Sequence, residues 1–399
     1  MKKRKHIDGQ KLVNDALENI LKWNVDDVRW DEISDGNVNY IYRIINKKTR
    51  ESYVLKVADN ATRVKPNGYL SPSRNAHEAG VLKYYSEKDS FILSPKVFAV
   101  NKRKNYFLME DIVPSVSLRH ALMEGVMPFN LGIKLSKFII EKSFPLLEIV
   151  NSDREIEKPC YLTYSKDLIK ITEDLVFTFP YYDIENRNVY TKENESYFKE
   201  MLLDSKLHLI SAKLKEKFKT YKQSLIHGDL HTGSILVKFK GERVLNEISD
   251  NMELFIVDPE FAFYGPIAYD VGNVLAHFYF VKIYNTFIIK DEVKRNVLLS
   301  FYQNEIESFI SSFYAEGFGF LKENVIDALY NNEEFINDYM KSIIDDAFRY
   351  AGLEIIRRVV GSAKVLEIES VEDANVRIPM ERKLMDIGLK YILDGSLGV

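Results

Sequence analysis

The chain has 399 residues, which suits two or three domains or one enzyme of two lobes and excludes a small disulfide-stapled scaffold. Hydrophobic residues make up 46% and charged residues 29%, which is ordinary globular usage and excludes a chain that is disordered overall. The net charge of −4 lacks the basic excess of a nucleic-acid-binding protein, so local groups must bind any anionic ligand.

The first residues are basic, but they do not lead into the apolar run of an export signal, because Asp8, Gln10 and Asn14 stand there. No stretch of about 18 apolar residues occurs, so no membrane-spanning helix is expected. The single cysteine, Cys160, cannot form an internal disulfide. These features predict a cytoplasmic protein with no nucleic-acid or membrane partner.

The N-terminal part is predicted to consist mostly of strands. Apolar residues recur at helical spacing from Gln10 to Lys22, and the period changes to two from Trp30 to Ile45. Asp35-Gly36-Asn37 is the expected hairpin turn, because Gly and Asn tolerate a positive φ. A strand, a loop, a helix and two strands should follow, at residues 53–57, 60–73, 76–85, 96–100 and 106–109.

The pattern changes near Glu110, and the chain after Ser117 is mostly helical. This predicts an α+β protein with an N-terminal lobe at residues 1–110 and a C-terminal lobe at residues 111–399. In the second lobe, two short strands at residues 224–226 and 254–257 are expected to be neighbours, with residues 242–251 as an exposed hairpin insertion between them.

Each of these two strands leads into a loop that carries acids. The first loop is His227-Gly228-Asp229-Leu230-His231-Thr232-Gly233-Ser234, and the second is Asp258-Pro259-Glu260. Since neighbouring strands would bring the loops together, a base would lie beside a site for a divalent metal ion. Phosphoryl transfer needs both.

Upstream residues fit the same chemistry. Lys56 lies in a predicted strand and Glu78 in the following helix, so the two side chains can pair and hold the lysine against nucleotide phosphates. The order along the chain is that of a protein-kinase-like phosphotransferase: Gly36 in a turn, then Lys56, Glu78, Glu110-Asp111 at a strand end, Asp229 and Asp258.

The loop His227-Gly228-Asp229-Leu230-His231 resembles the catalytic loop of the aminoglycoside phosphotransferase and choline kinase superfamily. The segments that resemble its methylthioribose kinase branch are residues 35–40, 232–235, 258–266, 269–272 and 355–358. The resemblance runs from Trp30 to Val365 and implies a two-lobed protein-kinase-like fold. It implies that the chain uses ATP and Mg²⁺ to phosphorylate the C1 hydroxyl of 5-methylthioribose for methionine salvage, as a homodimer.

The resemblance also implies roles for the residues of the two loops. Asp229 would be the base, or the orienting carboxylate, for the sugar hydroxyl. Asp258 and Glu260 would hold Mg²⁺, with Ser234 at the position where most relatives have an asparagine ligand. His227, His231 and Asp270 are expected to be structural and to brace the catalytic loop.

For ATP, the resemblance implies that Lys56 contacts the α- and β-phosphates and that Glu78 orients it. The backbone of Glu110, Asp111 and Ile112 would face the adenine. Asn39 would supply a polar contact in a turn with fewer glycines than protein kinases have. Pro259 would lie between the metal ligands at the nucleotide.

Arg357 and Arg358 lie in a predicted helix, and the resemblance places them at the sugar or the transferring phosphate, where guanidinium groups suit negative charge. The apolar face of that helix comprises Phe348, Ala351, Ile355 and Val359. By helical geometry Arg358 borders this face and Arg357 points elsewhere. The alternative is a solvated pair in which Arg358 bonds Glu354.

Three other functions remain open on the sequence alone. The chain could phosphorylate another small alcohol such as an aminoglycoside, choline or homoserine. A metallohydrolase could use His227, Asp229 and His231 as ligands, although only seven histidines occur and none clusters elsewhere. A nucleotide-binding pseudoenzyme is disfavoured by the joint presence of Lys56, Asp229 and Asp258.

Overall fold

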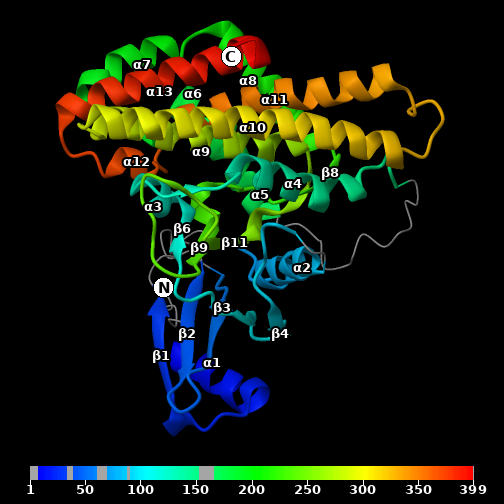
Figure 1. The fold of residues 1–399 in the computed structure, drawn as a ribbon, viewed down its shortest axis with the longest axis vertical. Coiled ribbons are helices and arrows are strands. Elements are labelled where there is room, and N and C mark those ends of the chain that lie inside the picture. Colours follow the sequence, from blue (N-terminus) through cyan, green and yellow to red (C-terminus); the bar gives the residue numbers. More distant parts are fainter. Residues whose placement is uncertain (1–7, 34–38, 61–69, 88–89, 152–165, 399) are drawn as a thin grey trace.

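A computed structural model of the chain describes residues 8–33, 39–60, 70–87, 90–151 and 166–398. The turn predicted at residues 35–37, most of the loop predicted at residues 60–73, and Cys160 lie outside these ranges. In the described part, an antiparallel sheet lies at one end of the molecule and a layer of long helices at the other (Figure 1). The α+β, two-lobed fold class is confirmed.

The N-terminal sheet has the strand order β1-β2-β3-β5-β4, with every pair antiparallel. Its strands are β1 (Val28–Ile33), β2 (Tyr40–Asn46), β3 (Ser52–Val57), β4 (Val97–Asn101) and β5 (Tyr106–Glu110). All five were predicted within a few residues. Alternation of side chains along a strand gives the sheet two buried faces, one for each of two helices.

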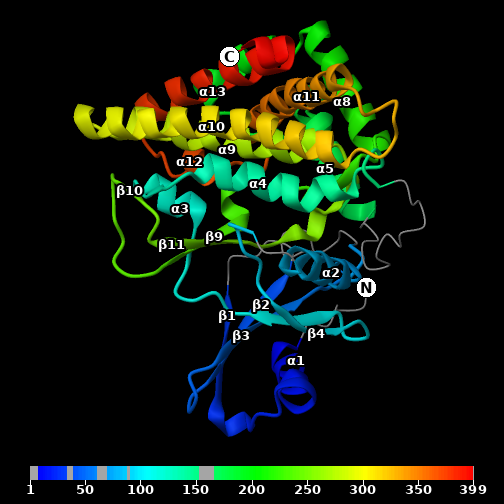
Figure 2. The same ribbon diagram turned by 45° about the vertical axis from the view of Figure 1, so that its right-hand side comes forward.

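The helix α1 (Gly9–Ala16), which continues as a π-helical turn to Leu21, packs on one face against Leu55 and Leu108. The helix α2 (Arg74–Ser86) packs on the other face, where Ala79 and Leu82 meet Phe107. Both helices were predicted, and α2 begins two residues earlier than expected. Figure 2 shows α1 below the sheet and α2 between the sheet and the helical layer.

The C-terminal part is built around α9, whose residues are buried on nearly all sides because α10, α11 and α13 surround it. Among the described helices, none combines the length and the apolarity needed to cross a membrane. The helices of this part are α3 (Leu118–Met123), α4 (Leu131–Ser143), α5 (Lys166–Phe177), α6 (Phe179–Tyr182), α7 (Glu195–Met201), α8 (Ser205–Thr220), α9 (Ile267–Ile288), α10 (Glu292–Asn324), α11 (Glu333–Val360), α12 (Leu366–Glu369) and α13 (Ala374–Asp394).

Seven short strands lie between the sheet and the helices. They are β6 (Val116–Ser117), β7 (Met127–Pro128), β8 (Ser224–Ile226), β9 (Ile235–Phe239), β10 (Ile248–Ser249), β11 (Met252–Ile256) and β12 (Phe263–Gly265). The prediction that β8 and β11 are neighbours was wrong. β11 pairs with β9 and β8 pairs with β12, because the chain forms a further apolar strand directly after Ser234.

The exposed insertion predicted at residues 242–251 does connect two paired strands, but these are β9 and β11. It is not a hairpin within itself, because its only described strand, β10, pairs in parallel with β7. The insertion therefore lies at the outside of the short three-stranded sheet β11-β9-β6.

Three glycines allow the long helices to approach closely. A Cβ atom on Gly272 of α9 would lie 2.6 Å from the carbonyl oxygen of Ala347 in α11. A Cβ atom on Gly352 of α11 would lie 2.4 Å from the carbonyl oxygen of Gly388 in α13. The position of α11 is therefore fixed on two sides by backbone contact.

We expect Gly272→Ala to lower the free energy of unfolding by about 1–3 kcal/mol, because the added methyl group meets backbone that cannot rotate away. Urea denaturation measures this change. Gly319→Ala in α10 is the control: no atom lies within 4 Å of its Cβ position, so the protein should keep or slightly gain stability. Equal stability of the Gly272 variant and the wild type would contradict the close approach.

Candidate active site

The loops that follow β8 and β11 are in direct contact. His227 donates from Nε2 to the carbonyl oxygen of Val257 at 3.0 Å, and the backbone N–H of Val257 donates to the carbonyl oxygen of Ser234 at 2.9 Å. The predicted meeting of the two loops is confirmed. We refer to residues 227–234 as the catalytic loop and to residues 257–261 as the acidic loop.

Asp270, in the first turn of α9, holds the start of the catalytic loop. Its carboxylate accepts the backbone N–H groups of His227 at 2.6 Å and of Gly228 at 2.9 Å. Gly228 has a φ of 79°, and a Cβ atom there would lie 2.3 Å from the carbonyl oxygen of Phe261, so glycine is required. Burial raises the pKa of Asp270 to about 7, while the two N–H groups oppose the shift. The predicted bracing by Asp270 is confirmed.

The two histidines of the catalytic loop are engaged inside it. Nδ1 of His227 accepts the N–H of Asp229 at 3.3 Å, and Nδ1 of His231 accepts the N–H groups of Gly233 and Ser234 at 2.9 and 3.0 Å. Among the residues that the structure describes, no three His, Cys, Asp or Glu side chains converge so as to hold a metal ion. The arrangement therefore gives the metallohydrolase no support.

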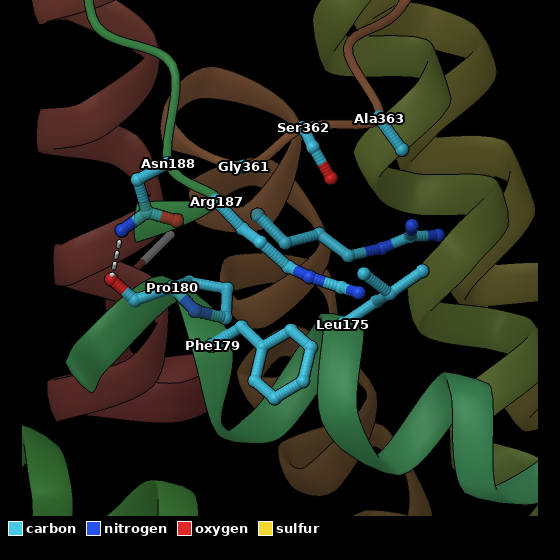
Figure 3. A pocket seen from close by; sticks show the side chains of 9 residues that line it. Leu175, Phe179, Pro180, Arg187, Asn188, Gly361, Ser362 and Ala363 are labelled. Atoms are coloured by element: carbon cyan, nitrogen blue, oxygen red, sulfur yellow. Dashed lines mark hydrogen bonds between the residues drawn. The ribbon is translucent and has the colours of Figure 1, made fainter. Parts of the chain in front are cut away.

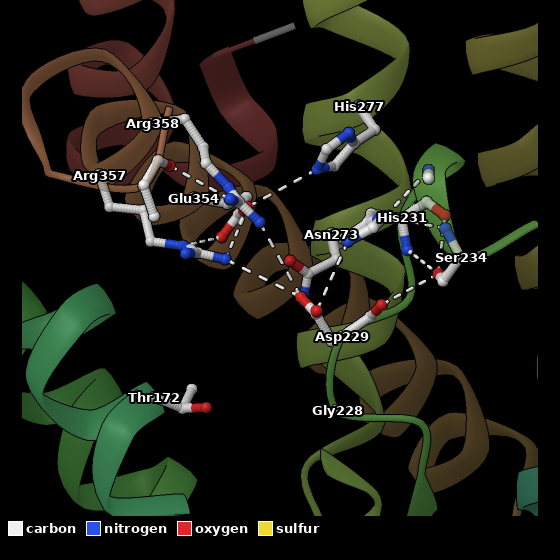
Figure 4. Close-up of polar contacts among 12 residues, drawn as sticks. Thr172, Gly228, Asp229, His231, Ser234, Asn273, His277, Glu354, Arg357 and Arg358 are labelled. Atoms are coloured by element: carbon white, nitrogen blue, oxygen red, sulfur yellow. Dashed lines mark hydrogen bonds and ion pairs between the residues drawn. The ribbon is translucent and has the colours of Figure 1, made fainter. Parts of the chain in front are cut away.

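Asp229 is the partly exposed acid at the centre of the site (Figure 4). Its Oδ2 lies 3.4 Å from Nε2 of His231, and its Oδ1 lies 4.0 Å from Nη2 of both Arg357 and Arg358. Burial opposes ionisation, but His231 and the two arginines hold the pKa of Asp229 well below its ordinary value. At neutral pH the carboxylate is therefore ionised and can accept a hydrogen bond from a hydroxyl group.

Both arginines project from α11 towards Asp229, as Figure 4 shows. The prediction that Arg357 points elsewhere was wrong: its side chain is 8% exposed and faces the site as that of Arg358 does. The reason is that α11 is packed against both α9 and α13, so this part of the helix has no single buried face. The predicted bond from Arg358 to Glu354 exists at 2.7 Å, but Glu354 is buried rather than solvated.

The ion pair predicted between Lys56 and Glu78 is present, with Nζ 2.6 Å from Oε1. Asp258 joins it, with Oδ1 2.5 Å from the same Nζ. Burial works against the charge of Lys56, but Asp258, Glu78 and Glu260 raise its pKa. Burial raises the pKa of Glu78, which the ammonium group opposes. The ammonium group of Lys56 in β3 thus joins an acid of α2 to an acid of the acidic loop.

Asp258 is presented outward from this cluster. Its backbone lies in the left-handed region at φ 62°, and its side chain is 49% exposed. Burial works against ionisation, yet Lys56 holds the pKa of Asp258 below its ordinary value. Non-glycine residues rarely adopt this backbone conformation, and those that do are often found at functional sites.

Glu260 is linked to the N-terminal part of the chain by Asn39, directly before β2, and through it by Arg74 of α2. Its Oε2 accepts from Nδ2 of Asn39 at 2.8 Å, and Oδ1 of Asn39 accepts from Nε of Arg74 at 3.0 Å. Arg74 was missed, because the predicted helix began at Ala76. The available signal was its spacing four residues before Glu78, which places both on one face of a helix.

Other predicted site residues lie near the junction of the lobes. Glu110 ends β5, its N–H donates to the carbonyl oxygen of Lys96 at 2.8 Å, and the buried carboxylate of Asp111 pairs with Arg43 at 2.8 Å. Ile112 is buried, and its carbonyl oxygen accepts from Ser115. Pro259 is buried in the acidic loop.

The hydroxyl group of Ser234 is used within the catalytic loop. It donates to the carbonyl oxygens of Asp229 and His231 at 3.1 and 2.8 Å and accepts from the N–H of His231 at 3.0 Å. These bonds fix the shape of the loop. They also direct the hydroxyl group to backbone atoms of its own loop rather than to the acidic loop.

A small pocket opens beside Arg357 (Figure 3). Its walls combine apolar side chains of α5 and α6 with Arg187 and the turn that follows α11. The guanidinium group of Arg187 lies over the ring of Phe179 at 5.0 Å. The cavity volume of about 10 Å³ is close to the room that one water molecule needs, so the pocket cannot hold a sugar ring in this state.

The chain is similar in sequence to known phosphotransferases. The sequence profile described as the phosphotransferase enzyme family matches residues 185–287, which include the catalytic and acidic loops. The methylthioribose kinase of Geobacillus kaustophilus is 29% identical over 366 residues, which is 91% of this chain and 86% of that protein. The methylthioribose kinase of Exiguobacterium sibiricum is 29% identical over 384 residues, or 95% and 92% of the two chains.

A solved structure, the ethanolamine kinase of Plasmodium vivax, aligns with a TM-score of 0.47 and 13% identity. The alignment covers 96% of this chain and 87% of that one.

Stability at acid pH should depend on His227. Burial lowers the pKa of His227 to about 4, so between pH 6.5 and 4 the unfolded chain binds a proton that the folded chain does not. The free energy of unfolding should therefore rise with pH across this window, by up to about 3 kcal/mol from this group. In His227→Gln this part of the rise should disappear, as urea denaturation at several pH values measures. The control is His120→Gln at an exposed position; wild-type slope in the His227 variant would refute the assignment.

Proposed function

We propose that the chain, whose residues 185–287 match the phosphotransferase enzyme family, is an ATP-dependent kinase of 5-methylthioribose. The product is 5-methylthioribose 1-phosphate, an intermediate for methionine salvage. The observation that carries the proposal is the convergence of Asp229 with Arg357 and Arg358 at 4.0 Å, beside the cluster of Lys56 and Asp258. The methylthioribose kinases described above match along nearly the whole chain.

In this proposal Asp229 accepts the hydrogen bond of the C1 hydroxyl group and orients its oxygen. That oxygen bonds to the γ-phosphorus of ATP, the bond from this phosphorus to the β–γ bridging oxygen breaks, and the hydroxyl proton passes to Asp229. Because the pKa of Asp229 is low, its main contribution is orientation and the late acceptance of the proton. Arg357 and Arg358 stabilise the negative charge on the transferring phosphoryl group.

Lys56 would contact the α- and β-phosphates of ATP, held in place by Glu78. Asp258 and Glu260 would hold Mg²⁺, which neutralises phosphate charge when bound. The residues fit this ion: burial and the neighbouring Asp258 raise the pKa of Glu260, so a cation would relieve two crowded carboxylates. Ser234 is left out of the ligand set, because its hydroxyl group serves the catalytic loop.

The remaining contacts belong to the same proposal. Glu110, Asp111 and Ile112 would present their backbone groups to the adenine. Asn39 would hold the Glu260 carboxylate in position, and Pro259 would shape the acidic loop. We further infer a division into lobes at residues 110 and 111, a homodimer, and a location in the cytoplasm, where ATP is available. Light scattering of the purified protein tests the dimer.

The second candidate is a kinase of another small alcohol with the same phosphoryl-transfer residues. A cationic substrate such as choline or an aminoglycoside requires acids at the acceptor position. The described groups nearest Asp229 are instead His231 and two arginines. The positive charge of the two arginines favours a neutral sugar acceptor over a cationic one.

The test is ADP release with Mg-ATP and a panel of methylthioribose, ribose, choline, homoserine and an aminoglycoside. We expect selective turnover of methylthioribose. Asp229→Asn should lower kcat by about 10²–10⁴-fold, because the amide cannot take the proton, while calorimetry should show nearly unchanged ATP binding. Turnover of a different alcohol would keep the kinase mechanism and show that methylthioribose is not the substrate. ATP binding without turnover of any alcohol would show that the protein is a pseudoenzyme. Wild-type turnover in Asp229→Asn would remove the role of this residue.

The metal requirement gives a separate prediction. Glu260→Gln should raise the Mg²⁺ concentration for half-maximal activity by about tenfold or more, because one carboxylate is lost while the side-chain shape is kept. Asp250→Asn, in the exposed insertion, is the control and should leave the requirement unchanged. A Mg²⁺ titration of kcat measures both variants. An unchanged requirement in Glu260→Gln would exclude this residue from the metal site.

A further inference from the structure

We propose that Glu354 is a positioning residue, whose buried carboxylate anchors both arginines of α11 and holds them away from Asp229. The inference rests on the proposed function of the site. Arg357 bonds Glu354 through Nε and through Nη2, the latter 2.9 Å from Oε1. Arg358 bonds the same Oε1 through Nε at 2.7 Å. One acid is therefore the shared partner of both cations.

Because Glu354 is buried, these bonds must compensate for the loss of water around its carboxylate. The residue is 1% exposed, and an isolated charge in such a place is costly unless it is paired and hydrogen-bonded. Burial works against ionisation, yet Arg357 and Arg358 hold the pKa of Glu354 well below its ordinary value. Two cations on one anion leave a net positive charge beside Asp229. Glu354 thus lowers the cost of burying the arginines without cancelling their charge.

The distances to Asp229 indicate the function of this anchor. Nη2 of each arginine lies 4.0 Å from Oδ1 of Asp229, which is beyond hydrogen-bond distance. A guanidinium group bound directly to Asp229 would occupy the oxygen that the substrate hydroxyl needs. Because Glu354 lies three and four residues before the arginines on one helix, anchor and cations form a single rigid unit.

A second contact supports the position of the carboxylate. Oε1 of Glu354 lies 3.6 Å from Nε2 of His277, a fully buried residue of α9. His277 in turn lies beside the catalytic loop, with ring centroids 5.0 Å from His231. Figure 4 shows this chain of side chains from α11 across α9 to the loop that carries Asp229. His277 thus fixes the position of the Glu354 carboxylate relative to the catalytic loop, which carries Asp229.

Glu354→Gln tests the proposal, because the amide keeps the size of the side chain and loses its charge and one acceptor. We expect kcat to fall by about 10–100-fold, with the KM for ATP nearly unchanged since Lys56 and Asp258 are untouched. Glu305→Gln is the matched control. Glu305 is a buried acid that accepts the N–H of Gly132 at 2.6 Å, so its loss should lower stability and leave kcat unchanged.

A cycle of variants separates positioning from a general structural effect. If Glu354 acts only through the arginines, then Glu354→Gln should cause no further loss of kcat in a protein that already carries Arg357→Ala and Arg358→Ala. A full additional loss in that background, or wild-type kcat in the single variant, would overturn the proposal. Should Glu354→Gln fail to fold, Glu354→Asp, which keeps the buried charge, enters the same cycle with the same expected result.

A crystal structure of the Glu354 variant tests the inference without any turnover, so that a wrong substrate does not affect it. We expect at least one guanidinium group to move to hydrogen-bond distance from Asp229. Arginines that keep their places without the anchor would overturn the inference and leave the proposed kinase activity intact. Conversely, a wild-type protein that phosphorylates none of the alcohols would remove the proposed function, while the observed movement of the arginines would still support the anchor.

Discussion

The ammonium group of Lys56 is the interaction on which the arrangement of the lobes depends. It is buried, and it lies between Glu78 of α2 and Asp258 of the acidic loop, at 2.6 and 2.5 Å. A buried charge is tolerated only with partners close by. Glu78 is such a partner within the N-terminal part, and Asp258 is the partner that joins Lys56 to the acidic loop. The side chain of Asp258 is 49% exposed, and in the proposed function it would meet Mg²⁺ and the phosphates of ATP there.

The C-terminal half of the site uses the same principle with buried acids. Asp270 gathers two backbone N–H groups and so fixes the catalytic loop, and Glu354 gathers two guanidinium groups and so fixes the arginines. Each acid converts a flexible feature into a defined geometry because each leaves its donors few alternatives. Neither acid touches the proposed reaction, and both determine where the groups that do so are placed.

The sequence predicted the strands of the sheet, α2, the contact of the two loops and the pair of Lys56 with Glu78, because each has a local pattern or a fixed order. It did not predict the bond of Asn39 to Glu260, which joins residues 221 positions apart with no local signal. The position of Arg357 was predicted wrongly, because a helical wheel assumes one buried face and α11 lies between two helices. The pairing of β8 was wrong because a short apolar run after Ser234 was not interpreted as a strand.

The glycine contacts of α11 connect the site to α13, a helix that supplies none of the site residues named above. α11 carries Glu354 and both arginines, and it is seated against α9 at Gly272 and against α13 through Gly352 and Gly388. A displacement of about 1 Å at reacting groups can cost about 10²-fold in rate. The close contact at Gly388 therefore affects the reaction through the spacing of α11 and α13. A larger side chain at this position would shift Arg357 and Arg358 relative to Asp229. Turnover would then change although every reacting side chain is still present.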